Sequence, residues 1–180
     1  MRSFIAIEMQ DKRIGEIQDQ LRRANADIKF VEPENLHFTL KFLGEIREDL
    51  VDKIHKIMEE SFKGIEGFEV NLKRVGVFPH LRHIRVVWVG MEDNKELLIK
   101  MQKKLDENIL KLGFKREKRF EPHLTIGRVK SARNKDKLAE IISSMNDIEV
   151  GKITVDKVLL KKSILTPKGP IYTTLREVKL

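Results

Sequence analysis

Cysteine is missing from this 180-residue chain. Its absence excludes disulfide bonds and thiolate metal sites and is typical of a cytoplasmic protein, which is the location we expect. No apolar run approaches the ~18 residues that a membrane-spanning helix needs, so we expect no membrane association. The N-terminal apolar run ends at Glu8 and lacks the longer apolar core and the cleavage site of a signal peptide. We therefore expect this run to form the first strand of the fold.

Linkers and cofactor motifs are missing as well. No tract rich in Pro, Gly or Ser divides the chain, so we expect a single domain over residues 1–180. No glycine-rich phosphate-binding loop is present, so the sequence does not indicate ATP use. His80 and His83 lack thiolate partners and the spacing of a zinc site, and we expect them in a solvated loop. We expect no cofactor and no metal.

Charged residues, by contrast, are abundant. They make up 36% of the chain against 41% hydrophobic residues, which is the composition of a soluble, folded and very charged protein. The 36 Lys and Arg exceed the 28 Asp and Glu, and the net charge of +8 favours a polyanionic partner such as RNA. Many Lys, Arg and Glu without cysteine is also the composition of a thermophile's protein.

The positive charge is concentrated in residues 111–135. This stretch contains two acidic residues and nine basic ones: Lys111, Lys115, Arg116, Lys118, Arg119, Arg128, Lys130, Arg133 and Lys135. Such a stretch attracts nucleic acid if it lies beside a binding site, whereas a solvated surface is the alternative interpretation.

Two tetrapeptides share the pattern His-apolar-Thr-apolar: His37-Phe38-Thr39-Leu40 and His123-Leu124-Thr125-Ile126. In a strand, residues i and i+2 point to the same face, so each motif places an imidazole beside a hydroxyl and turns two apolar side chains the other way. Two such motifs among five histidines arise by accident about once in a hundred chains of this composition. The pair therefore favours a shared site for acid–base chemistry on a phosphate ester over two unrelated core histidines.

The predicted elements follow a duplicated order, βαβαβ twice, with each motif on the second strand of its half. The first half, about residues 1–80, has expected strands at 4–8, 37–43 and 68–77 and helices at 11–24 and 48–62. The second half, about residues 81–180, has strands at 84–89, 123–129 and 153–160, helices at 94–112 and 135–145, and a final strand at 171–178. Gly113 is the expected C-cap of the longest helix. We predict two lobe-forming halves related by a pseudo-twofold axis, which would bring the two motifs together.

At this level of detail the chain resembles the two-histidine phosphoesterase superfamily, and within it the RNA 2′,3′-cyclic phosphodiesterases, also called 2′-5′ RNA ligases. The similarity covers essentially the whole chain, and its most specific parts are the long motif contexts at residues 33–44 and 119–128. Shorter similar segments lie at residues 2–7, 76–79, 87–90, 113–114, 160–163 and 169–172.

The resemblance implies a bilobal α+β fold, in which antiparallel sheets flank a central cleft and the helices lie outside. It implies metal-independent hydrolysis of RNA 2′,3′-cyclic phosphate ends to 2′-phosphate, with 2′-5′ ligation as the reverse of the same transfer in some members. It also implies an RNA partner with a 2′,3′-cyclic phosphate or a 2′-5′ linkage, tRNA fragments among the candidates. We expect a monomer.

Residue types and resemblance together give the candidate site. His37 and His123 are the predicted acid–base pair, and Thr39 and Thr125 are the predicted donors to the phosphate oxygens. Related enzymes are usually drawn with His123 in the place of the base and His37 in that of the acid, but the sequence does not decide between them. No metal ligand is predicted.

Two further residues lie five positions after the motif histidines. Arg128 matches a family arginine near the phosphate; on a regular strand it would face away from His123, so it must lie past the strand end or beyond a bulge. Phe42 is the counterpart after His37, and a base could stack on it. The alternatives are a surface cation for Arg128 and core packing for Phe42.

Two other classes of function stay open. One is a non-catalytic RNA- or nucleotide-binding module, against which the two intact motifs argue, because binding alone does not need two histidines. The other is an esterase acting on small cyclic nucleotides or 2′-5′ oligonucleotides, over which the net charge of +8 favours RNA. The physiological RNA is not indicated by the sequence.

Overall fold

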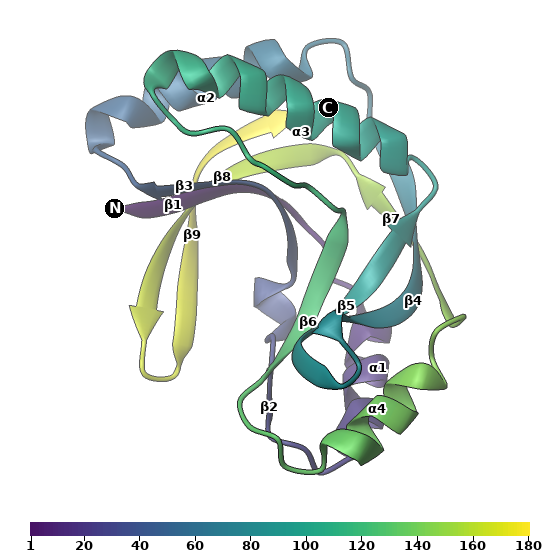
Figure 1. The fold of residues 1–180 in the computed structure, drawn as a ribbon. Coiled ribbons are helices and arrows are strands. Elements are labelled where there is room, and N and C mark those ends of the chain that lie inside the picture. The colour runs from purple at the N-terminus through teal and green to yellow at the C-terminus, as the bar shows by residue number, and fades with distance from the viewer.

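The structure is a computed structural model that describes all of residues 1–180. The chain forms four α-helices and nine strands, arranged as Figure 1 shows. The first six elements are β1 (Arg2–Glu8), α1 (Lys12–Arg22), β2 (Ile28–Phe30), β3 (His37–Glu45), α2 (Val51–Phe62) and β4 (Phe68–His80). The remaining seven are β5 (His83–Glu92), α3 (Lys95–Ile109), β6 (His123–Val129), α4 (Lys135–Ser143), β7 (Glu149–Val155), β8 (Lys157–Thr166) and β9 (Gly169–Lys179). None of the helices is long and apolar enough to cross a membrane.

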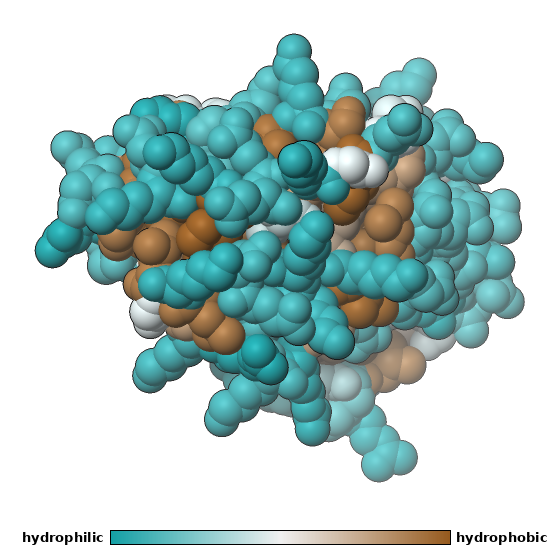
Figure 2. Space-filling model, turned by 90° about the horizontal axis from the view of Figure 1, so that it is seen from above, coloured by the Kyte–Doolittle hydropathy of each residue, from teal (hydrophilic) through white to brown (hydrophobic).

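The strands form two antiparallel sheets, which confirms the predicted α+β class. Sheet A has the order β3-β1-β8-β9, and sheet B has the order β2-β6-β5-β4-β7. Helices α2 and α3 pack together over sheet A, whereas α1 and α4 lie against sheet B (Figure 1). Hydrophilic side chains cover most of the face that α2 and α3 present when the molecule is seen from above (Figure 2). Each sheet therefore has a helical outer layer, and the other face of each is available for a cleft.

The two sheets do not correspond to the two halves of the sequence. Sheet A combines β1 and β3 with β8 and β9, and sheet B combines β2 and β4 with β5, β6 and β7. The prediction that residues 1–80 and 81–180 each form one lobe is therefore wrong, because β4 leaves its own half to pair with β5. The pseudo-twofold relation nevertheless holds in the order of strands, since β3-β1-β8-β9 corresponds to β6-β5-β4-β7 with β2 added at the edge. The motif strands β3 and β6 occupy equivalent places.

Several element boundaries differ from the prediction. The three-residue strand β2 was not predicted, and the single strand expected at 153–160 is two strands that separate at Asp156. The expected loop containing His80 and His83 is the end of a hairpin, in which these two histidines face each other across a two-residue turn. Gly113, with φ of +83°, ends the helical segment as predicted, a backbone conformation that glycine adopts without steric cost.

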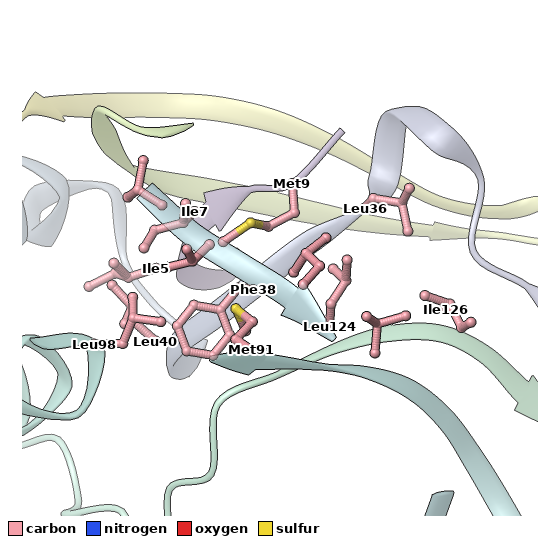
Figure 3. Close-up of a cluster of buried hydrophobic side chains, with 14 of the residues drawn as sticks. Ile5, Ile7, Met9, Leu36, Phe38, Leu40, Met91, Leu98, Leu124 and Ile126 are labelled. Carbon is pink, nitrogen blue, oxygen red and sulfur yellow. The ribbon is translucent and has the colours of Figure 1, made fainter. Parts of the chain in front are cut away.

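A single hydrophobic core of 38 buried residues joins the two lobes. Phe38 and Leu40 reach it from β3, and Leu124 and Ile126 reach it from β6 (Figure 3). Full burial of each side chain of this size stabilises the folded state by about 1.5–3 kcal/mol. Because the apolar residues of both motifs enter the same core, the packing fixes the two motif strands relative to each other.

Candidate active site

The polar residues of both motifs face one cleft. It has a volume of about 960 Å³, and its walls include His37 and Thr39 from sheet A and His123 and Thr125 from sheet B. All four side chains are half-buried. The alternation that the motifs predicted is thus present in both strands, with imidazole and hydroxyl toward the cleft and the apolar side chains toward the core.

Both imidazoles are held in the same way by the backbone that precedes them. His37 Nδ1 lies 2.6 Å from the carbonyl oxygen of Asn35, and His123 Nδ1 lies 2.7 Å from the carbonyl oxygen of Glu121. A carbonyl oxygen can only accept a hydrogen bond, so Nδ1 carries the hydrogen in each ring. Each neutral ring therefore keeps its lone pair on Nε2, which is the nitrogen available for proton exchange.

The sheet A histidine lies among aromatic rings. The centroid of the His37 ring is 4.9 Å from that of Phe4, and it meets Tyr172 edge-on at 5.2 Å. Burial raises the pKa of Tyr172 above its ordinary value, so this phenol is a neutral neighbour of His37.

An ion pair next to His37 and an arginine of sheet B are the charged groups that act on this imidazole. Lys161 of β8 donates a hydrogen bond to the carboxylate of Glu8, and Glu8 lies directly across from His37 in the β1–β3 register. Burial lowers the pKa of His37 below its ordinary value, and the positive charges of Lys161 and Arg128 act in the same direction. The neutral imidazole is therefore favoured in the empty cleft.

The sheet B histidine has an aromatic backing in place of an ion pair. His123 meets Phe78 edge-on at 4.9 Å between centroids, and the Phe78 ring lies 5.4 Å from that of Trp88, tilted by 39°. A Cβ atom added at Gly76 would approach the Trp88 ring to 2.3 Å, so glycine is what allows the indole to lie flat on the sheet. Trp88 is paired with Thr125 in the β5–β6 register, which places this aromatic cluster directly beside the second motif.

Each motif strand contains a bulge immediately after its threonine. In β3 the register shifts so that Ile5 opposes Lys41 and Ala6 opposes Thr39, which leaves Leu40 as the extra residue. An extra residue reverses the alternation beyond it, so Phe42, which parity would turn away from His37, returns to the cleft face. Phe42 lines the cleft and is 64% exposed, which excludes core packing for this ring.

The β6 bulge has the same consequence for Arg128. Val87 opposes Gly127 and Trp88 opposes Thr125, so Ile126 is the extra residue. Its carbonyl oxygen accepts hydrogen bonds from the Val31 backbone and from the buried side chain of Gln18, which anchors the bulge. Arg128 lies beyond the bulge, within β6, and lines the cleft.

Further cations line the cleft. Besides Arg128, they include Arg2, Lys29, Arg119, Lys130 and Lys168. Of the nine basic residues in the stretch 111–135, only Arg119, Arg128 and Lys130 are cleft residues. No three His, Asp or Glu side chains lie together in a way that could hold a metal ion. Four carboxylates, those of Glu32, Glu34, Glu117 and Glu121, line the cleft as well, and the basic side chains from both sheets outnumber them.

Sequence reasoning missed the groups around His37. Glu8 and Lys161 are 153 residues apart, and Tyr172 lies on a different strand from both. The single tyrosine of the chain, within a segment that resembles the phosphoesterases, was the signal that could have marked this wall of the cleft.

Solved structures share this architecture. TT0787 of Thermus thermophilus superposes with a TM-score of 0.80 at 25% identity, covering 100% of this chain and 98% of that one. LigT of E. coli, solved in complex with 3′-AMP, superposes with a TM-score of 0.77 at 25% identity, covering 99% of this chain and 97% of its own. The fold is therefore that of LigT.

Sequence similarity establishes the family. The model of the family described as LigT like Phosphoesterase matches residues 5–88 and again residues 89–172, so the chain belongs to the LigT-like phosphoesterases. A relative named RNA 2′,3′-cyclic phosphodiesterase, from Methanothermobacter thermautotrophicus, is 46% identical over 100% of this chain and 99% of its own length. The double match agrees with the duplicated order of elements.

Proposed function

We propose that this protein hydrolyses RNA 2′,3′-cyclic phosphate ends to 2′-phosphates without a metal ion, with His37 and His123 as the acid–base pair. The observation that carries the proposal is the matched setting of the two imidazoles, each with Nδ1–H bonded to a carbonyl and both in one cleft. Membership of the LigT-like family and the name of the M. thermautotrophicus relative support the same reaction.

The reaction needs one proton acceptor and one proton donor. Water attacks the phosphorus atom as a neutral imidazole takes its proton, and the bond between phosphorus and O3′ breaks as the second imidazole, protonated, gives its proton to O3′. The products are a 2′-phosphate and a free 3′-hydroxyl. Two histidines on opposite walls suit this in-line displacement, because imidazole exchanges protons near neutral pH.

The remaining site residues bind the phosphate and the base. Thr39 and Thr125 donate their hydroxyl hydrogens to the non-bridging oxygens, each stabilising the transition state by about 2–4 kcal/mol when desolvated. Arg128 supplies the positive charge that the phosphate needs. Phe42, which projects into the cleft with 64% of its surface exposed, is the platform for the base.

The low pKa of His37 bears on which imidazole is the base. The resemblance assigns the acid role to His37, whereas burial and the nearby cations favour its neutral form in the free enzyme, which suits a base. We therefore propose that His37 accepts the proton from water and that His123 protonates O3′. This assignment is separate from the proposed reaction and has its own test in the Discussion.

The direct experiment is incubation of the purified protein with an oligonucleotide that ends in a 2′,3′-cyclic phosphate, in EDTA, followed by end-group analysis. The expected product carries only a 2′-phosphate. An unchanged end group, a 3′-phosphate, or activity that disappears with chelator and returns with a divalent ion would contradict the proposal. The variant lacking both imidazoles is the blank for contaminating nucleases.

The cations along the cleft favour RNA over a small cyclic nucleotide as the substrate. Lys29, Lys130 and Lys168 line the same cleft as the motifs, and each can neutralise a phosphate of a longer strand. With the 5′-hydroxyl of a second strand in place of water as the nucleophile, the same groups can open the cyclic phosphate to a 2′-5′ linkage, while O3′ leaves and takes a proton as in hydrolysis. RNA ends of this kind, tRNA fragments among them, are suitable substrates. Comparing kcat/KM for a mononucleotide and an oligonucleotide tests this preference.

A further inference from the structure

Lys41 is a buried cation in the first motif strand. It follows the β3 bulge, its side chain is 2% exposed, and its Nζ lies 2.5 Å from Asp106 Oδ1 of α3. The same nitrogen donates to the carbonyl oxygen of Lys115 at 2.6 Å and lies 3.5 Å from Glu117 Oε1. Burying a lysine is costly unless it is paired and hydrogen-bonded, and here both conditions are met.

Asp106 holds the same segment from its other side. Its two carboxylate oxygens accept the backbone N–H of Glu117, at 3.3 and 3.1 Å. The Lys41–Asp106 pair therefore binds one carbonyl and one N–H of the irregular segment 114–122. No backbone–backbone hydrogen bond connects this segment to the rest of the chain. Its apolar anchors are Phe114 and Phe120, which pack against the core, and the ring centroid of Phe120 lies 5.6 Å from that of Phe38.

The anchored segment leads directly into the second motif. Glu121, four residues after Glu117, supplies the carbonyl oxygen that holds His123 Nδ1–H. A displacement of the segment would move this carbonyl and release the ring. His37 has an independent support, because its carbonyl partner Asn35 belongs to a short 3₁₀ turn and donates its side-chain amide to Pro170 O at 3.2 Å.

We propose that Lys41 and Asp106 are positioning residues for His123, through which the first motif strand and α3 set the orientation of the imidazole in the second motif. The proposal rests on the proposed function for its catalytic consequence but not for its structural one. It makes a one-sided claim: removing the pair releases His123 and leaves His37 in place.

The test uses the double variant Lys41→Met/Asp106→Leu. Replacing a buried ion pair by apolar residues of similar volume is often neutral for stability, so the variant should fold, whereas a single substitution would leave an unpaired buried charge. The matched control is Arg176→Met/Asp52→Leu, which removes an ion pair between β9 and α2 that does not touch the segment.

Two readouts are needed. The first is the NMR signal and tautomer of each imidazole in the substrate-free protein, which we expect to lose the Nδ1–H form for His123 only. The second is kcat on a mononucleotide 2′,3′-cyclic phosphate, which we expect to fall about 100-fold, as misplacement of a reacting group by ~1 Å can do. KM should change little, since Thr39 and Arg128 are untouched.

The outcomes separate this proposal from the proposed function. An unchanged His123 signal, or equal changes at both histidines, overturns the positioning role, and so does a folded double variant with wild-type kcat. If the wild-type protein fails to hydrolyse the cyclic phosphate, the NMR comparison still decides the structural claim. The control variant should show wild-type signals and rates in every case.

Discussion

The two walls of the cleft hold their histidines with the same backbone arrangement and place aromatic rings beside both, but an ion pair lies next to only one of them. On both walls Nδ1 donates to the carbonyl two residues earlier, and a bulge follows the threonine. His37 lies beside the Glu8–Lys161 ion pair, whereas His123 lies against the rings of Phe78 and Trp88. The backbone thus sets where each imidazole is, and on the sheet A wall burial and the neighbouring cations lower the pKa of His37.

The difference arises at equivalent positions of the two sheets. Across from His37 is Glu8, and across from His123 is Gly90. The place that Lys161 takes in sheet A corresponds to that of Phe78 in sheet B, because each lies on the strand beyond the central neighbour of its motif strand. These two differences place an ion pair next to His37 and leave His123 without one.

The largest expected effect is a loss of activity on removing either histidine. His37→Ala and His123→Ala should each lower kcat/KM about 100- to 10,000-fold, because each removes a general acid or base. Initial rates on a mononucleotide 2′,3′-cyclic phosphate measure this, with circular dichroism and thermal unfolding as checks of the fold. A variant that keeps full activity would show that only one wall is catalytic and would end the proposed mechanism.

Removing the hydroxyls should have the next largest effect. Thr39→Val and Thr125→Val keep the shape of the side chain but lose a donor to the phosphate, and kcat should fall about 100-fold in each. Thr39→Ser and Thr125→Ser are the controls and should retain most of the rate, since they keep the hydroxyl. Equal rates for the Val and Ser variants at either position would show that the hydroxyl there does not contact the phosphate.

A pH titration sharpens the contrast between the walls. Lys161→Met removes a positive charge near His37, so the pKa of His37, lowered in the wild type, should rise toward its ordinary value. If His37 is the base, the acidic limb of the kcat/KM profile should move to higher pH with it, since a base must be deprotonated. NMR titration of the two imidazoles measures the first effect directly.

The control for that titration is Lys157→Met, which removes a cation from the same strand, β8, where it pairs with Glu177 outside the cleft. It should leave both histidines unchanged. A Lys161→Met variant in which the pKa of His37 falls, or in which both histidines shift alike, contradicts the local origin of the asymmetry.

The smallest effect concerns the basic segment beside the sheet B wall. Replacing the exposed Lys115, Arg116 and Lys118 by Gln should weaken the binding of long RNA. The slope of log K against the logarithm of the salt concentration should become shallower by about 0.7 for each phosphate contact that is lost. Hydrolysis of a mononucleotide should change little. Arg128→Ala differs in kind, because its guanidinium lies in the cleft and its loss should slow both substrates.

The matched control neutralises Lys53, Lys56 and Lys63, which are exposed at α2 on the outer face of sheet A. It makes the same change in net charge. If both triple variants lose affinity equally, the segment has no special role, and the effect belongs to total charge alone.

Local patterns were enough to predict the parts of the site that lie within one strand. The spacing of His and Thr gave the cleft face of β3 and β6, and the parity of Arg128 required the bulge that the β5–β6 register contains. Gly113 predicted a helix end because glycine adopts the positive φ of a helix cap without steric cost, which depends on this residue alone. Each of these predictions depends on neighbours a few positions away.

Features that depend on distant partners could not be predicted. The pairing of β4 with β7 joins segments that are far apart in the sequence, and no pattern within β4 indicates it. Strand β2 has three residues, too few to show a periodicity, and Asp156 separates β7 from β8 in a segment whose apolar residues fit a single strand. The ion pair of Glu8 with Lys161, which distinguishes the two walls, exists only because β1 and β8 are neighbours in sheet A.

The exchange of β4 into the opposite sheet has an evolutionary consequence. A protein made of one repeat unit would leave β4 without its neighbour β5 and would own a single motif, so it could neither close a sheet nor assemble a site. Two copies related by a true twofold axis would satisfy both needs at once, since such an interface is self-complementary. The duplicated chain therefore has the arrangement of a homodimer that exchanges strands, with the two units joined covalently, and its two walls can carry different residues, which identical subunits cannot.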